Sequence, residues 1–531
     1  MAANFGKYMR FIARRERVAG LVWMAALVLF LTAMAAIFPG LFPTQEALVS
    51  MAATLDTPAM AAMIGPVYGL DRISPAIAMA QECLLWTAVA AMVMNILFVN
   101  RHTRADEELG RQEMLAALPV GRLAGSAATL ACAFALDAAI SLFAALGILA
   151  VNIEGITAAG AFCYAFSIGT QGFLFAAVTL LTAQLFSTAR GSMGAAFSVL
   201  GVSYVLRAAG DMAGNALSVI SPMGLGLKVQ AFYTDAFWPV AALFLEAVVI
   251  TAAALILHAK RDVGAGVFAA RKGRTGASRL LQSPFGFAWR LSRGSFLAWA
   301  IAFTVLGAMY GTVVGEIDSF AEGNDMIRQL LTAQGGGAGS LAEAYLPMLC
   351  GTMALLASVP VIGTVSRLRS EEKRGRIEQI FACAVPRASI FGSFVAIAAA
   401  EAILFSFLSA FGLYVTSQGT GCLSFGTIMG ASFVYVPAIF TLAGLTAFLV
   451  GCFPKLTAFV WALFGYSFFL LYFERLFDVP EWAAKISPFG NVPGYPVQEL
   501  AAAPLTVLCV AAAALSAAGY LAGYRRRDVR A

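Results

Sequence analysis

Charged residues are scarce in this sequence. Asp, Glu, Lys and Arg make up 12% of its 531 residues, whereas an average soluble domain is roughly a quarter charged. Apolar residues account for 60% of the chain, and the mean hydropathy is +0.82. A chain of this composition cannot hide its apolar surface inside one water-facing globule and needs lipid instead. The composition therefore excludes a soluble enzyme, a secreted disulfide scaffold and a disordered protein.

The residues that build common catalytic and metal sites are also few. The only histidines are His102 and His258, and the eight cysteines show neither metal-ligand nor CxxC spacing. The sequence has no G-x4-G-K-[ST] phosphate loop, because its one Gly-Lys pair, Gly6-Lys7, is followed by Tyr8. We therefore expect a chain with no metal site, no cofactor, no nucleic-acid partner and no enzyme activity of its own.

Long apolar runs are what the sequence has in excess. A bilayer is crossed by about 20 helical residues, and helices are the only form in which such runs satisfy their backbone groups in lipid. We therefore predict an all-α polytopic membrane protein of about 12 transmembrane helices. The runs lie at 19–38, 77–99, 123–152, 158–186, 191–210, 237–257, 295–315, 346–365, 389–415, 424–451, 455–474 and 501–523.

Basic residues gather in alternate loops between these runs. With twelve spans, most of the 35 lysines and arginines fall on one side, which the positive-inside rule identifies as the cytoplasm. Both termini are then expected to be cytoplasmic. In the N-terminal flank Lys7, Arg10 and Arg14 fall on one helical face and Met9 and Ile12 on the other. This pattern predicts an amphipathic helix on the inner membrane surface, or alternatively a flank that only fixes topology.

Four short motifs recur in the same order, and each lies at the same place relative to the spans. The first pair is 276 residues apart and the other three are 265 or 266 apart. The pairs are Arg14-x2-Arg17-x5-Trp23 with Arg290-x2-Arg293-x5-Trp299, Glu107-x2-Gly110-Arg111-x-Glu113 with Glu372-x2-Gly375-Arg376-x-Glu378, Ile220-Ser221-Pro222 with Ile486-Ser487-Pro488, and Arg261-Asp262-Val263 with Arg527-Asp528-Val529. We interpret the chain as a parallel duplication, with six-span halves at 1–258 and 291–531, a cytoplasmic linker at 259–290 and a pathway between the halves.

Two cytoplasmic segments, residues 101–122 and 367–387, combine a charged start with an apolar end. In the second, Ile377, Ile380, Phe381 and Ala384 follow helical spacing, and Pro119 and Pro386 are expected to stop the two helices. Such a helix suits docking in a groove of a partner, although one copy alone would equally fit a solvated loop. The candidate docking residues are Glu107, Gly110, Arg111, Glu113, Leu115, Glu372, Gly375, Arg376, Glu378 and Phe381.

With these motifs the chain resembles a permease of the ABC type-2 exporter family, and most of all the fused two-half subgroup that exports polyketide antibiotics and other drugs. In that family each half carries a coupling helix between its second and third spans. The residues that match its pattern are Gly110, Glu113, Pro119, Gly375 and Glu378. The second copy departs from the pattern, because Ala384 stands where Pro119 maps and Pro386 comes two residues later.

The resemblance implies a transport subunit without ATPase activity. ATP and Mg²⁺ would be bound by a separate ABC ATPase, with two copies docked on the two coupling helices. The cargo would be hydrophobic or amphipathic small molecules such as antibiotics, and the location the cytoplasmic membrane of a bacterium.

Two other functions stay open at this point. A proton-coupled drug antiporter also has two parallel six-helix halves, but its usual loop motif is matched only in part by Asp106 and Gly110-Arg111, and the run 158–186 holds no basic residue. A non-transporting sensor or immunity component has no positive support in the sequence.

Four acidic residues fall within the apolar runs: Glu82, Asp137, Glu246 and Glu401. A charge at the bilayer centre costs about 2.5–3.5 kcal/mol on insertion scales, so such residues are expected to face the bundle interior. They would either favour cationic or polar amphipathic substrates or form hydrogen bonds between helices, with Arg207 or Arg475 as candidate partners. We favour the structural interpretation.

Overall fold

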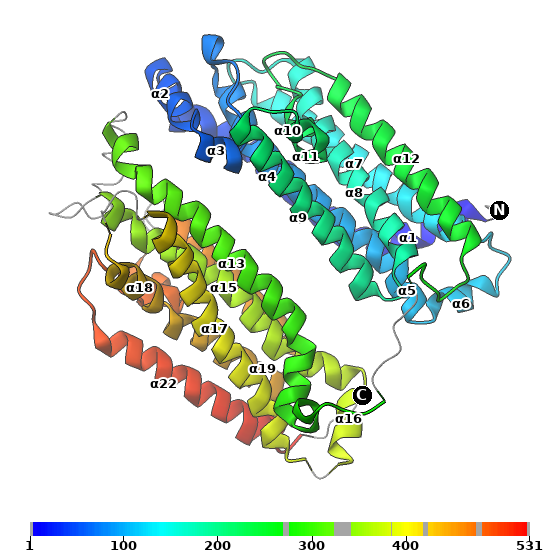
Figure 1. Ribbon diagram of the computed structural model, residues 1–531, viewed down its shortest axis with the longest axis vertical. Coiled ribbons are helices and arrows are strands. Elements are labelled where there is room, and N and C mark those ends of the chain that lie inside the picture. Colours follow the sequence, from blue (N-terminus) through cyan, green and yellow to red (C-terminus); the bar gives the residue numbers. More distant parts are fainter. Residues whose placement is uncertain are drawn as a thin grey trace. The chain divides into compact units, whose positions relative to one another are not determined.

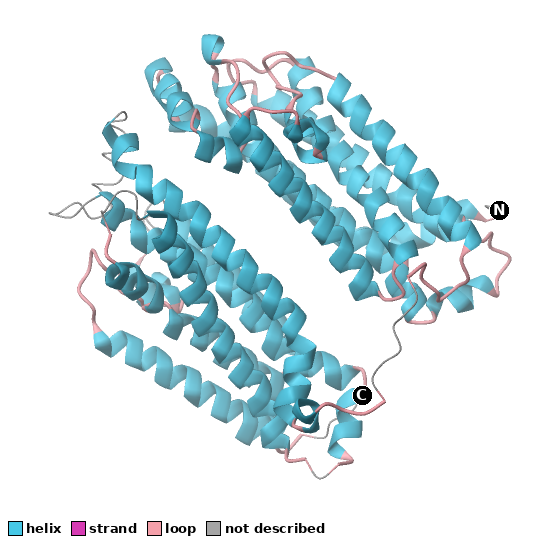
Figure 2. Ribbon diagram, in the orientation of Figure 1, coloured by secondary structure: helices cyan, strands magenta, loops and turns pink. Residues whose placement is uncertain are grey.

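The computed structural model describes residues 4–268, 275–322, 341–383, 385–417, 423–473 and 480–527. The chain divides into two compact units, Met1–Gly273 and Arg274–Ala531, and in the described ranges every regular element is a helix (Figure 2). Twelve helices are long and apolar enough to cross a membrane, six in each unit. The predicted all-α, twelve-span fold class is confirmed.

The first unit is a bundle of six long helices (Figure 1). They are α1 (Phe5–Leu41), α4 (Pro75–His102), α7 (Ala124–Val151), α8 (Ala158–Leu185), α9 (Ala189–Ala213) and α12 (Trp238–Lys260). Short helices close its two ends: α2 (Gln45–Leu55), α3 (Pro58–Met63), α10 (Leu217–Ile220) and α11 (Pro222–Leu227) at one end, and α5 (Arg104–Glu108) and α6 (Arg111–Ala116) at the other (Figure 1).

Helix α8 forms the centre of this bundle. It packs against α4, α7, α9 and α12, and most of its side chains are buried. Helices α4, α8 and α9 each begin after a hydroxyl residue, Ser74, Thr157 and Thr188, whose side-chain oxygen accepts a hydrogen bond from the backbone N–H three residues on. These caps satisfy donors that a helix start would otherwise leave without a partner.

The second unit contains α13 (Pro284–Glu322), α15 (Leu341–Lys373), α16 (Arg376–Phe381), α17 (Arg387–Ser417), α18 (Phe425–Phe433), α19 (Val436–Cys452), α20 (Ala458–Phe473), α21 (Glu481–Ala484) and α22 (Ala502–Ala518). The predicted run 424–451 is two helices, α18 and α19, with a break at 434–435. Pro437 lies in the first turn of α19, where its missing N–H is not needed, whereas inside one continuous helix it would remove a hydrogen bond.

The helices pack in the same order in both units. Helix α13 packs against α17 as α1 does against α7, α15 against α19 as α4 does against α8, and α19 against α22 as α8 does against α12. The proposed duplication accounts for this repeated order.

The N-terminal flank does not form a separate surface helix. Helix α1 is continuous from Phe5 to Leu41, and its side chains Tyr8 and Ile12 are buried against Ala128 and Cys132 of α7. The apolar face that the sequence assigns to lipid is therefore covered by protein, and the polar end of α1 is a direct extension of the first span.

Glycines let some helices meet backbone to backbone. A Cβ atom on Gly307 of α13 would lie 2.1 Å from the carbonyl oxygen of Ser409 on α17. A Cβ atom on Gly412 of α17 would lie 2.5 Å from the carbonyl oxygen of Thr304. Small residues commonly allow such close approach between membrane helices, so the α13–α17 contact depends on the absence of side chains at these positions.

Candidate functional site

Each unit carries a short charged helix at the end of its second long helix. We call residues 103–119 the first elbow, which includes α5 and α6, and residues 371–383 the second elbow, which includes α16. Both turn at a glycine in the left-handed region, Gly110 at φ 70° and Gly375 at φ 66°. Since nothing lies within 4 Å of a Cβ atom built on Gly110, backbone conformation alone explains why glycine suits this position.

We expect Gly110→Ala to lower the free energy of unfolding of the first unit by about 1–2 kcal/mol, the usual cost of a left-handed residue with a Cβ atom. Gly110→Asn should cost less, because asparagine tolerates this conformation better. Denaturant unfolding of the purified chain, with amide exchange in α6 as the local readout, measures both. Equal stability of the Ala and Asn variants would contradict the conformational explanation.

Glu107 is the buried anchor of the first elbow. Its carboxylate accepts two hydrogen bonds from Arg261, both at 2.7 Å, one from Arg104 at 2.8 Å and one from the backbone N–H of Gly264 at 2.6 Å. The side chain of Glu107 is only 3% exposed, and that of Arg104 1%. Arg261 follows α12, so this cluster fastens the elbow to the end of the last long helix of its unit.

The second elbow is fastened in the corresponding way. Glu372 accepts a hydrogen bond from Arg527 at 2.6 Å, just beyond the final helical turn of the second unit. Arg387 of α17 donates to the backbone oxygen of Arg527 at 2.8 Å. The structure thus joins two motifs that the sequence shows only as separate repeats, because Glu107 and Glu372 bind the first arginine of the two Arg-Asp-Val segments.

The arginine after each glycine also bonds back to an acid. Arg111 contacts Asp106 at 2.9 Å, and Arg376 contacts Glu371 at 2.8 Å. In the first elbow Asp106 further accepts two hydrogen bonds from Arg15 of α1, at 2.5 and 3.0 Å. These pairs hold the acidic residues inside the chain, so Glu107, Glu372 and their neighbours position the elbows and are not free to contact a partner.

The two elbows expose different surfaces. On the first, Leu109, Met114 and Leu118 are 61%, 69% and 55% exposed, Glu113 is exposed, and Leu115 packs next to Tyr8 and Ile12. The first elbow therefore presents an apolar surface with one acidic residue.

The second elbow turns its apolar face inward. Ile377 is fully buried, Ile380 and Phe381 pack against the core of their own bundle, and Glu378 and Gln379 are exposed. The helical spacing was therefore correct, but much of that face is not available to a partner, and Ala384 lies outside the described residues. Helices α6 and α16 end at Ala116 and Phe381, before Pro119 and Pro386, so the prolines follow the helix ends and do not set them.

Asp137 and Glu401 each accept a hydrogen bond between two long helices. Asp137 of α7 bonds to Asn95 of α4 at 2.9 Å, and Glu401 of α17 bonds to Thr364 of α15 at 2.9 Å. The other carboxylate oxygen of each has no hydrogen-bond partner in the part of the chain that the structure describes.

The arginine predicted as a partner lies elsewhere. Arg207 bonds to Asp211 at 3.1 Å and donates to the backbone oxygens of Ala61 and Ala62, so it fastens α3 to α9. Arg475 lies outside the described residues. Glu82 on α4 and Glu246 on α12 are half-buried.

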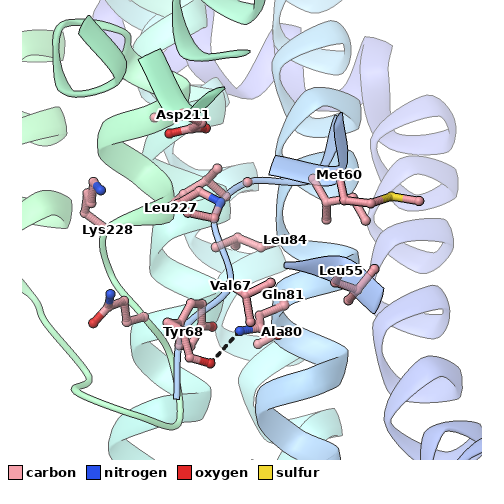
Figure 3. A pocket seen from close by; sticks show the side chains of 15 residues that line it. Leu55, Met60, Val67, Tyr68, Ala80, Gln81, Leu84, Asp211, Leu227 and Lys228 are labelled. Atoms are coloured by element: carbon pink, nitrogen blue, oxygen red, sulfur yellow. Dashed lines mark hydrogen bonds between the residues drawn. The ribbon is translucent and has the colours of Figure 1, made fainter. Parts of the chain in front are cut away.

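A cavity of about 150 Å³ lies beneath the short helices that close the first unit. Figure 3 shows Gln81 donating to the backbone oxygen of Tyr68, at 2.6 Å, among lining residues that include Asp211 and Lys228. Burial, together with the nearby Asp235 carboxylate, raises the pKa of Tyr68 well above its ordinary value. The Tyr68 hydroxyl therefore stays protonated and donates to the backbone oxygen of Ala231 at 3.3 Å. This cavity is small, and its polar groups serve the cap.

Sequence reasoning missed Arg104 and Asn95, and it noted Arg261 and Arg527 without a role. The available signal was the equal spacing, since Glu107 and Glu372 are 265 residues apart and Arg261 and Arg527 are 266 apart. Within the described ranges, no cluster of three or more His, Cys, Asp or Glu residues is arranged to hold a metal ion.

Comparison with known proteins gives two findings. Residues 281–525 match a family model described as the C-terminal domain of the multidrug efflux system permease Rv1217c. The chain is also 34% identical over 530 residues to the multidrug efflux system permease protein Rv1217c of Mycobacterium tuberculosis (strain ATCC 25618 / H37Rv), an alignment that covers 98% of this chain and 94% of that protein.

Proposed function

Because the chain belongs to the family of the multidrug efflux permease Rv1217c, we propose that it is the membrane subunit of an ATP-driven drug exporter whose ATPase is a separate chain. The match over nearly the whole chain agrees with the drug-exporter resemblance drawn from the short motifs. ATP-driven coupling is the finer proposal, and the observation that carries it is the repeated fastening of a short charged helix to the last long helix of each unit.

In this proposal the two elbows transmit force from the ATPase. A push on α6 would pass through Glu107 and Arg261 to the end of α12, and along the chain into α4, which packs on the central helix α8. A push on α16 would pass through Glu372 and Arg527 to the end of the second unit. Charge-assisted hydrogen bonds of this kind are short and geometrically specific, so they suit a mechanical link better than a mobile loop does.

The remaining parts of the proposal follow from the same roles. ATP and Mg²⁺ are bound by the partner, since the sequence of this chain has no phosphate loop. Two ATPase copies engage the two elbows from the cytoplasm, where both termini also lie. The cargo is hydrophobic or amphipathic, and the protein resides in the cytoplasmic membrane of a bacterium.

Charge reversal on the exposed part of each elbow tests the docking. We expect Glu113→Arg with Glu378→Arg to abolish co-purification of a phosphate-loop ATPase and ATP-dependent export, because a misplaced charge at an interface costs several kcal/mol. Each single variant should retain partial binding. Affinity purification from the native host followed by mass spectrometry measures this.

Glu154→Arg and Glu499→Arg provide matched controls. Both residues are exposed, one in each unit, and both lie on the side of the membrane opposite the elbows, so ATPase binding should be unchanged. Drug transport by the solitary chain in liposomes, driven by a proton gradient without nucleotide, would contradict the proposal and favour the antiporter function.

A further inference from the structure

The first unit contains a groove lined mainly by phenylalanine. Its volume is about 400 Å³, which lies in the range of small-molecule sites, and it is formed by helices α7, α8 and α12. The residues that define it are Phe134, Phe166, Phe173, Phe237, Phe244 and Asp137. We call this the phenylalanine groove.

The aromatic rings form a connected cluster with faces open to a ligand. The ring centroids of Phe134 and Phe173 are 5.2 Å apart, and those of Phe173 and Phe244 are 6.1 Å apart. Phe134, Phe166 and Phe244 are 46%, 39% and 43% exposed, so the rings are not consumed by packing in the bundle. The groove opens on the side of the unit where α7, α8 and α12 carry these exposed side chains.

Asp137 is the one acidic residue of the groove. It is 2% exposed, and its Oδ1 atom is held by Asn95 of α4. Helix α8 closes on it from one side, because a Cβ atom on Gly172 would lie 3.0 Å from Oδ1. Its Oδ2 atom has no partner among the described residues, so the groove holds a buried acceptor that nothing in the described chain satisfies. Such an acceptor is costly unless a donor or a cation approaches it.

The second unit has a buried acid without the aromatic lining. Glu401 lies 264 residues after Asp137 and is also fully buried. The five phenylalanines, moved by the 265-residue spacing of the repeated motifs, correspond to Ala399, Ala431, Ala438, Ala502 and Cys509. The rings are therefore not a requirement of this helix arrangement, and the combination of acid and aromatic faces is specific to the first unit.

We propose that the phenylalanine groove binds lipophilic monovalent cations, with the Asp137 carboxylate facing the cationic centre and the rings contacting its apolar body. This inference rests on the proposed export function and assigns it a substrate class. Aromatic faces attract cations, and more strongly when water is excluded, while the carboxylate discriminates against anions of the same shape. A lipid acyl chain would fill the apolar part of the groove but would leave the Oδ2 atom of Asp137 without a partner.

The test uses the purified full-length chain in lipid nanodiscs, without ATPase or nucleotide. The probes are radiolabelled tetraphenylphosphonium and its shape-matched anion tetraphenylborate. We expect Asp137→Asn, which keeps the size and one carbonyl acceptor for Asn95, to raise the Kd for tetraphenylphosphonium about tenfold or more. Phe244→Leu, which keeps an apolar side chain, should raise it about 3- to 10-fold. Neither variant should change tetraphenylborate binding.

Glu401→Gln is the matched control and should leave the Kd of both probes unchanged. Tetraphenylphosphonium binding that is the same in Asp137→Asn and wild type would overturn the inference, as would equal losses for both probes or for Glu401→Gln. If Asp137→Asn does not fold, the Phe244→Leu comparison between the two probes decides the matter. Because no ATPase is present, failure of the coupling proposal would leave these Kd values unchanged, and failure of the cation site would leave ATPase co-purification unchanged.

Discussion

Glu107→Gln is expected to lower the free energy of unfolding of the first six-helix unit by about 3–5 kcal/mol, the usual cost of breaking a buried ion pair. The substitution keeps the side-chain volume but leaves Arg104 and Arg261, 1% and 9% exposed, without their common counter-charge. Denaturant unfolding of the purified chain, followed by circular dichroism, measures the change. ATP-dependent export should fall in parallel, because the elbow would no longer be fixed to α12.

Two comparisons make this prediction specific. Glu113→Gln changes an exposed residue of the same elbow and should alter stability by less than about 0.5 kcal/mol. Glu372→Gln should cost less than Glu107→Gln, because its partner Arg527 is 25% exposed and water can solvate the freed charge. A Glu107→Gln variant as stable as Glu113→Gln would show that the buried cluster does not hold the elbow.

Gly307→Ala is expected to reduce the stability of the second unit by about 3 kcal/mol, at the upper end of the usual cost of overpacking. The added methyl group would lie 2.1 Å from the Ser409 carbonyl oxygen, and backbone cannot move aside as the tip of a flexible side chain can. Helices α13 and α17 must therefore separate. Denaturant unfolding and the yield of folded protein from the membrane both report the loss.

Gly294→Ala, in the same helix, should have the opposite sign. Nothing lies within 4 Å of a Cβ atom at Gly294, so alanine adds helix propensity and should stabilise the unit by about 0.4–1 kcal/mol. The two variants have the same chemistry and differ only in what faces the new methyl group. If both change stability by the same amount, the close approach of α13 and α17 is not present in the folded protein.

The positions of the spans could be predicted from the sequence because burial in lipid depends on composition. The helix ends could not, since a helix continues beyond the apolar run as long as its backbone stays helical. Helix α13 begins at Pro284, before the predicted start at residue 295, and carries Arg290 and Arg293 in its early turns. The division between α18 and α19 depends on Pro437, whose signal was hidden within a strongly apolar run.

The contacts of the candidate site were harder to predict because they join distant parts of the chain. Glu107 and Arg261 are 154 residues apart, and their recurrence shows that both are repeated without showing that they meet. Helical spacing identified the apolar face of residues 377–384, but spacing does not tell whether a face turns toward a partner or toward its own bundle. Ile377 turns toward its own bundle.

The phenylalanine groove had no signal in the sequence at all. The chain has 41 phenylalanines, so five of them on three different helices do not stand out before the helices are assembled. Asp137 did stand out as an acid in an apolar run, and hydrogen bonding between helices was the interpretation favoured for it. The structure gives it such a bond through Asn95, with a second oxygen left facing other chemistry.

The presence of both six-helix units in one polypeptide has a genetic consequence. In a transporter assembled from two copies of a half-length protein, every codon change would be expressed twice, on both sides of the molecule. Here a change at Asp137 or Phe244 leaves Glu401 and its alanine-rich surroundings untouched. Selection can therefore alter cargo recognition in one half while the other keeps its original character, and resistance mutations in such a gene should accumulate unevenly between its two halves.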